Sequence, residues 1–167
     1  MQSLIEQVES VARKAGLRVE EPRGVAPPPG MEWVRDIIAE GPGIRVVVRV
    51  AGSERDRRLV LIMPIGFSEV HMRLIQGLPL EERMALLARL LREVIHVCPY
   101  CRVGVGGAPT TPQGIIAEIH YVDGVPDSQR LLDDITRLIS VFMAVNTVLW
   151  ERFPGTMPGH EKPQLYT

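Results

Sequence analysis

Residues 44–65 read IRVVVRVAGSERDRRLVLIMPI, and this stretch decides the fold class. In its first part, Val46, Val48 and Val50 share one face, while arginines occupy the other. In its second part, a second set of apolar residues alternates with other side chains: Leu59, Leu61, Met63 and Ile65. Alternation with a period of two is typical of strands that bury one face. The polar break at 52–56 predicts a hairpin, so the stretch predicts an antiparallel pair.

Helical and strand patterns continue on both sides of this pair. Residues 31–40 predict a weaker strand before it, which completes a three-stranded meander. A short helical stretch begins at Ser68 and is interrupted at 77–79, and apolar residues from Leu80 then recur at steps of three and four until about Val97. The remaining predicted elements are a first helix (4–15), a hairpin (102–107 and 114–122) and a last helix ending near residue 153.

The resulting order is α-βββ-α-ββ-α, in which strands come in antiparallel groups and do not alternate with helices. This order favours an α+β fold: a five-stranded antiparallel sheet with helices packed on one face. The chain has 167 residues, a usual size for one domain. We predict a single domain over 1–153, a proline-rich linker at 22–30 after the first helix, and a flexible tail at 154–167.

Composition excludes several partner classes. The formal net charge is −1, so the chain has no bulk attraction for nucleic acid or an anionic membrane. Its arginines are spread along the chain without the aromatic residues that RNA-binding sheets interleave with basic ones. The longest apolar stretch, 139–150, is too short for a bilayer and contains polar residues, and no secretory signal is visible at the start. We therefore expect a cytoplasmic protein with no membrane partner and no nucleic-acid partner.

Both cysteines lie in the segment Cys98-Pro99-Tyr100-Cys101, which resembles the active-site motif of glutaredoxins in spacing and letters. That chemistry needs a thiolate at a helix N-terminus, where the helix dipole lowers the thiol pKa. Here the motif follows a predicted helix, and the partial negative charge at a helix C-terminus raises a thiol pKa. A structural disulfide or a pair of reduced thiols is therefore favoured over thiol-redox chemistry.

A zinc site would need four ligands, and the chain offers one set: His96, Cys98, Cys101 and His120. The two cysteines form half of such a site, but the two histidines lack a close spacing of their own. The alternative for His120 is an ordinary place on the polar face of a strand. The acidic pair Asp133-Asp134 is interpreted as stabilising the start of the last helix. We predict no catalytic residue, no cofactor and no bound metal.

The element order resembles the type III secretion chaperone-like fold over about residues 1–153. Two features carry this resemblance: the helix, linker and meander at the start, and the helix at 80–97 between the two groups of strands. The fold includes homodimeric chaperones that bind extended segments of partner proteins, and also uncharacterised prokaryotic proteins. The chain lacks the marked net acidity of the secretion chaperones and is closer to the uncharacterised proteins. The resemblance carries over no functional residue.

These observations favour a non-enzymatic binding or chaperone-like module with a protein or peptide partner. The alternative is a thiol-redox or zinc-binding protein that uses Cys98 and Cys101. The last helix is apolar nearly all round between Ile135 and Trp150, more than one sheet face can cover. Because monomers rarely expose large apolar patches, we expect a homodimer with apolar helix surface in its interface.

Overall fold

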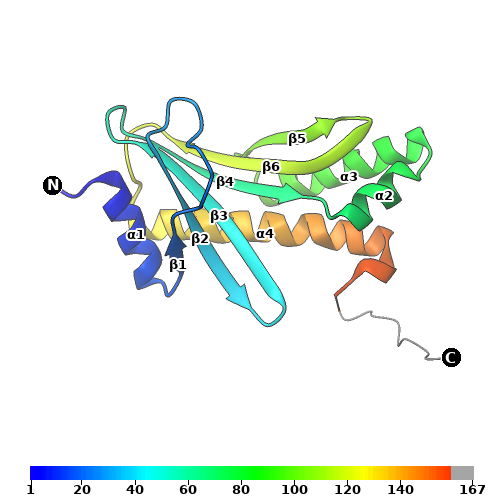
Figure 1. Ribbon diagram of the computed structural model, residues 1–167, viewed down its shortest axis with the longest axis horizontal. Helices are drawn as coiled ribbons and strands as arrows, with labels where there is room; N and C mark the ends of the chain where they lie inside the picture. The colour runs from blue at the N-terminus through cyan, green and yellow to red at the C-terminus, as the bar shows by residue number, and fades with distance from the viewer. Residues whose placement is uncertain (159–167) are drawn as a thin grey trace.

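A six-stranded antiparallel sheet forms the centre of the molecule, and a long helix runs across its strands (Figure 1). The computed structural model describes residues 1–158. The elements in chain order are α1 (Leu4–Lys14), β1 (Arg18–Glu20), β2 (Trp33–Gly41), β3 (Ile44–Ser53), β4 (Arg58–Gly66), α2 (Glu69–Gln76), α3 (Leu80–Val97), β5 (Arg102–Ala108), β6 (Thr111–Tyr121), α4 (Ser128–Arg152) and the 3₁₀ turn η1 (Pro154–Thr156).

The protein is an α+β protein, but the prediction of five strands in the order α-βββ-α-ββ-α is wrong. The sheet has six strands in the spatial order β1-β2-β3-β4-β6-β5. The missed strand is β1, whose three residues pair with the middle of β2. Three residues are too few to show a period of two. The helical stretch after Ser68 is also an element of its own, α2, so the order is α-ββββ-αα-ββ-α.

The core lies between the sheet and α4. The inward side chains of β3, β4 and β6 are those that the alternation predicted, and Val50, Leu61 and Ile115 are fully buried. Against them α4 places its own apolar stripe: Leu131, Ile135, Leu138, Val141 and Val145. Helices α1 and α3 both contact α4, and α3 forms the more extensive of these two contacts. Burial of this apolar surface is the main stabilising contribution.

Among residues 1–158, no helix lies on the opposite face of the sheet, here called the helix-free face. Strand register places Ala51, Val60 and His120 in one row on this face, and Arg49, Ile62, Glu118 and Arg102 in the next. The segment 22–30, here called the proline arm, connects β1 to β2. It follows the first helix along the chain, as predicted from the sequence, and the short strand β1 lies between the two. Pro28 and Pro29 of the arm line a groove on this face, described below.

Two further sequence predictions concern membrane-spanning segments and the C-terminal tail. Among residues 1–158, no helix has both the length and the apolar character needed to cross a bilayer. In the predicted tail, Pro154–Thr156 form η1, and the Thr156 hydroxyl lies 2.7 Å from Nε2 of His71 in α2. Residues 159–167 of that tail lie outside the described residues, so its flexibility stays a prediction.

Candidate functional site

The two cysteines form a disulfide at the junction between α3 and β5. Cys98 caps the C-terminus of α3, donates its N–H to the Val94 carbonyl at 2.8 Å and is fully buried. The N–H of Cys101 donates to the Cys98 carbonyl at 3.2 Å, and β5 starts at the next residue. The position after a helix is the one expected from the sequence. The helix C-terminus disfavours a thiolate there, so the geometry is that of a structural link.

A buried carboxylate lies beside this disulfide loop. The exposed fraction of Asp134 in α4 is only 4%. Its Oδ1 accepts a hydrogen bond from the Tyr100 hydroxyl at 2.8 Å, and its Oδ2 accepts one from the Tyr121 hydroxyl in β6. The closest cation is Arg130, whose Nε is 3.8 Å from Oδ2. This tyrosine–aspartate cluster therefore joins the loop, the sheet and α4.

The cluster alters the chemistry of both tyrosines. Burial, followed by the hydrogen bond to Asp134, raises the pKa of Tyr121 above its ordinary value. The same causes, in the same order, raise the pKa of Tyr100. Both phenols therefore remain protonated donors and are poor general bases. The cluster stabilises the contact between the disulfide loop, the sheet and α4. It does not supply a nucleophile.

Sequence reasoning missed the role of Asp134. It was placed near the start of the last helix, but α4 begins at Ser128 and has no acidic residue in its first turn. A signal was present in the chain, because Asp134 falls on the apolar stripe between Leu131 and Leu138, where a carboxylate is out of place. A buried carboxylate requires hydrogen-bond partners, and the tyrosines are those partners.

The four residues weighed as a zinc set are not brought together. His96 is exposed on α3, and His120 lies on the helix-free face, where its Nε2 is 2.8 Å from a Glu118 oxygen. Both cysteines are in the disulfide. Within residues 1–158, no group of three or more histidine, cysteine or acidic side chains could hold a metal ion. His120 therefore occupies an ordinary position on the polar face of a strand, which the sequence offered as the alternative to zinc binding.

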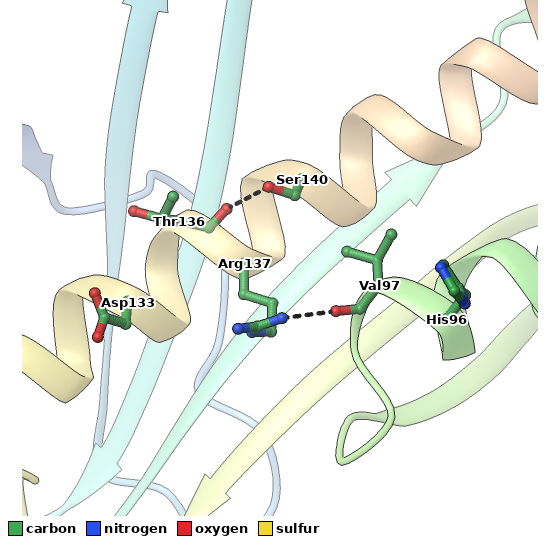
Figure 2. A pocket seen from close by; sticks show the side chains of 6 residues that line it. All are labelled: His96, Val97, Asp133, Thr136, Arg137 and Ser140. Atoms are coloured by element: carbon green, nitrogen blue, oxygen red, sulfur yellow. Dashed lines mark hydrogen bonds between the residues drawn. The ribbon is translucent and has the colours of Figure 1, made fainter.

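Two hollows adjoin these elements. The larger, about 490 Å³, lies between α3 and α4 and is shown in Figure 2; its lining residues are His96, Val97, Asp133, Thr136, Arg137 and Ser140. Three of its polar side chains already have local partners: Arg137 donates to the Val97 carbonyl at 3.0 Å, Ser140 donates to the Thr136 carbonyl at 3.1 Å, and Asp133 accepts from Gln129 at 2.8 Å. This hollow offers few unused donors to a ligand.

The second hollow is a groove of about 320 Å³ between the proline arm and the helix-free face. Its floor contains Val60 and Ile62 of β4, and its wall contains Pro28, Pro29 and Met31. Polar side chains also line the groove: Arg58, Arg102, Glu118 and His120. An apolar groove with a few polar groups at its rim is typical of a ligand site. No sequence pattern indicates this groove, because only tertiary structure places the arm over β4 and β6.

Comparison with known proteins reports the same fold without a described activity. The chain is similar to the crystal structure of an uncharacterized protein from Methanothermobacter thermautotrophicus, with 14% sequence identity and a TM-score of 0.73, over 90% of this chain and 99% of that chain. No curated protein matches the sequence. The resemblance to type III secretion chaperones thus stays a prediction. Residues 4–149 match the family described as "Uncharacterized conserved protein (DUF2299)". Because this match covers most of the sequence, the chain belongs to the DUF2299 family of uncharacterized conserved proteins.

Proposed function

We propose that this protein is a non-enzymatic binding module that holds an extended segment of a partner protein in the groove under the proline arm. The single observation that carries the proposal is the groove itself, with its apolar floor at Val60 and Ile62 and its wall at Pro28 and Pro29. Its volume of about 320 Å³ lies at the small end of ligand sites. It therefore suits a few side chains of a peptide better than a large cofactor.

The proline arm supports this proposal energetically. Proline fixes the backbone φ angle, so the wall of the groove loses little conformational freedom when a ligand binds. The arm is also held at its end, where the N–H of Glu32 donates to the Gly52 carbonyl at 2.8 Å. A preformed wall above an apolar floor favours an extended segment, which has few internal contacts of its own to give up.

A homodimer with apolar helix surface in its interface is part of the same proposal. Within residues 1–158, α4 contributes none of the large apolar side chains that are exposed, because α3, α1 and the sheet cover its sides. Among the exposed apolar side chains, Ile44, Ile116 and Val122 lie in or beside strands, and a larger group lies on α2 and α3: Val70, Leu74, Leu80, Met84 and Ile95. We propose that a second copy covers these two helices. Light scattering at micromolar concentration should give twice 18.6 kDa, and the monomer mass would contradict the dimer.

The binding function is tested by selecting from a library of linear peptides displayed on phage, with the full chain as the target. Ile62→Trp fills the floor of the groove and should abolish binding of the selected peptides. Ile116→Trp is the matched control, because Ile116 lies on the same sheet face and does not line the groove. Peptides that bind both variants equally, or a selection that enriches none, would refute the proposal.

A further inference from the structure

Two arginines of the groove differ from the other arginines of the sheet. Arg18, Arg35, Arg45 and Arg49 each form an ion pair with a carboxylate. By contrast, the guanidinium groups of Arg58 and Arg102 form no hydrogen bond or ion pair with any of residues 1–158; both side chains are exposed and line the groove. Guanidinium groups without a protein partner at the rim of an apolar groove are suited to bind an anion from a ligand.

The proline arm adjoins Arg58, and the sheet fixes the backbone position of Arg102. A Cβ atom added at Gly30 would lie 2.9 Å from Nη2 of Arg58, so this guanidinium lies directly against the arm. Arg102 is the first residue of β5 and follows the disulfide, and strand register places it across from Glu118. The arm thus limits the freedom of the Arg58 side chain before any ligand binds, which reduces the entropic cost of binding there, while the exposed Arg102 side chain is positioned only by its strand.

Among residues 1–158, Glu118 is the one carboxylate that lines the groove, and it forms no ion pair with these arginines. A Glu118 oxygen is 2.8 Å from Nε2 of His120, and no ion pair joins it to Arg102, its cross-strand neighbour. Two arginines and one glutamate leave a formal charge of +1 at the groove when the histidine is neutral. A single negative charge balances this site, whereas a phosphate dianion would leave it negative.

We propose that the groove recognises its ligand by a carboxylate, which is held by Arg58 and Arg102 while an adjoining apolar side chain of the ligand lies on Val60 and Ile62. This inference rests on the function proposed above and names the chemical class of the partner segment. The carboxylate comes either from an aspartate or glutamate side chain or from the C-terminus of the partner. Both sources present the same two oxygen atoms to the guanidinium groups.

The test titrates the full chain with small probes and follows the Nε–Hε resonances of its arginines by NMR. One probe, N-acetyl-leucinate, has a terminal carboxylate, and a second, a peptide amide with glutamate between two leucines, has a side-chain carboxylate. N-acetyl-leucine amide is the neutral control, and inorganic phosphate is the dianion. We expect at least one carboxylate probe to shift Arg58 and Arg102 saturably and to bind about tenfold more tightly than the neutral amide. The tighter probe identifies the source.

Variants decide whether the arginines carry this preference. Arg102→Met and Arg58→Met should each weaken binding of the carboxylate probe about tenfold and leave the neutral amide unaffected. Arg92→Met is the matched control, since Arg92 is exposed on α3 and does not line the groove. Equal affinity for carboxylate and amide, or phosphate binding as tight as carboxylate binding, would overturn the inference.

The inference and the proposed function can fail separately. If selected peptides lose binding to Ile62→Trp but retain it in both Arg58→Met and Arg102→Met, the binding function stands and carboxylate recognition is wrong. If the small carboxylates bind at the two arginines but no peptide is selected, carboxylate recognition stands and the peptide-binding function is wrong.

Discussion

Replacing Tyr121 by phenylalanine should destabilise the fold while leaving its packing intact. The substitution removes one hydroxyl that donates to the buried Asp134 and keeps the ring, which is 8% exposed. A hydrogen bond to a charged group contributes about 1.5–3 kcal/mol. Tyr100 still donates to the other oxygen of Asp134. We therefore expect Tyr121→Phe to lose about 2 kcal/mol of unfolding free energy, or about 4–8 °C in Tm for a chain of this size.

The same variant has a signature at alkaline pH. Because the folded state raises the pKa of Tyr121 above the ordinary value of 10.0, the folded chain keeps a proton that the unfolded chain releases. Stability from this group is fully present below about pH 10 and is lost as the pH rises further. Tyr121→Phe should therefore flatten the loss of stability above pH 10. Tyr100, whose pKa is also raised, should preserve part of the slope.

Urea denaturation followed by circular dichroism at pH 7 and at pH 10–11 measures both effects. Tyr100→Phe is the matched control: its hydroxyl also donates to Asp134, but the side chain is half exposed, and the loss should be smaller. Equal stability of Tyr121→Phe and the unmodified chain at pH 7 would refute the account of the cluster. An unchanged alkaline slope in Tyr121→Phe would refute the account of its pKa.

Three further predictions concern other parts of the fold. The double variant Cys98→Ser with Cys101→Ser should lose about 2 kcal/mol, the entropy expected for so short a loop, and should still bind the selected peptides; lost peptide binding would contradict a structural role. Burial lowers the pKa of His71, so the folded state binds a proton less readily than the unfolded chain. Stability should therefore fall as the pH drops below about 6.5. His71→Gln should remove that fall in a pH series of melting curves. A Cβ at Gly114 would collide with a backbone oxygen of β4, so Gly114→Ala should lose about 1–3 kcal/mol of unfolding free energy, measured by thermal unfolding. Gly104 has open space around it, so Gly104→Ala should lose less than about 1 kcal/mol. Equal losses in the two variants would show that the contact at Gly114 does not matter.

Local patterns predicted the elements that are long enough to show a period. The alternation in 44–65 identified β3 and β4 and their buried faces, and the helical spacing from Leu80 identified α3 up to its end near Val97. The three residues of β1 are held by pairing with β2, and a strand that depends on its neighbour leaves little trace in its own sequence. That is why the sheet was predicted one strand short.

The candidate site could not be predicted in the same way. Pairing between β4, β6 and β5 brings Arg58 and Arg102 to one face, and the proline arm then encloses them. Each of these steps depends on contacts between distant parts of the chain. The homodimer stays a prediction: the apolar sides of α4 were visible in the sequence, but the way α3 packs on them, which moves the proposed interface to α2 and α3, was not.

The central claim is that a partner segment binds in the groove through a carboxylate. Its most direct test is an NMR titration of the full chain with the tightest selected peptide, with the shifts mapped on the structure. The account predicts that the largest shifts fall on Arg58, Val60, Ile62 and Arg102, and that they vanish when the acidic group of the peptide is converted to an amide. Largest shifts on α2 and α3, with unmoved resonances in the groove, would contradict it.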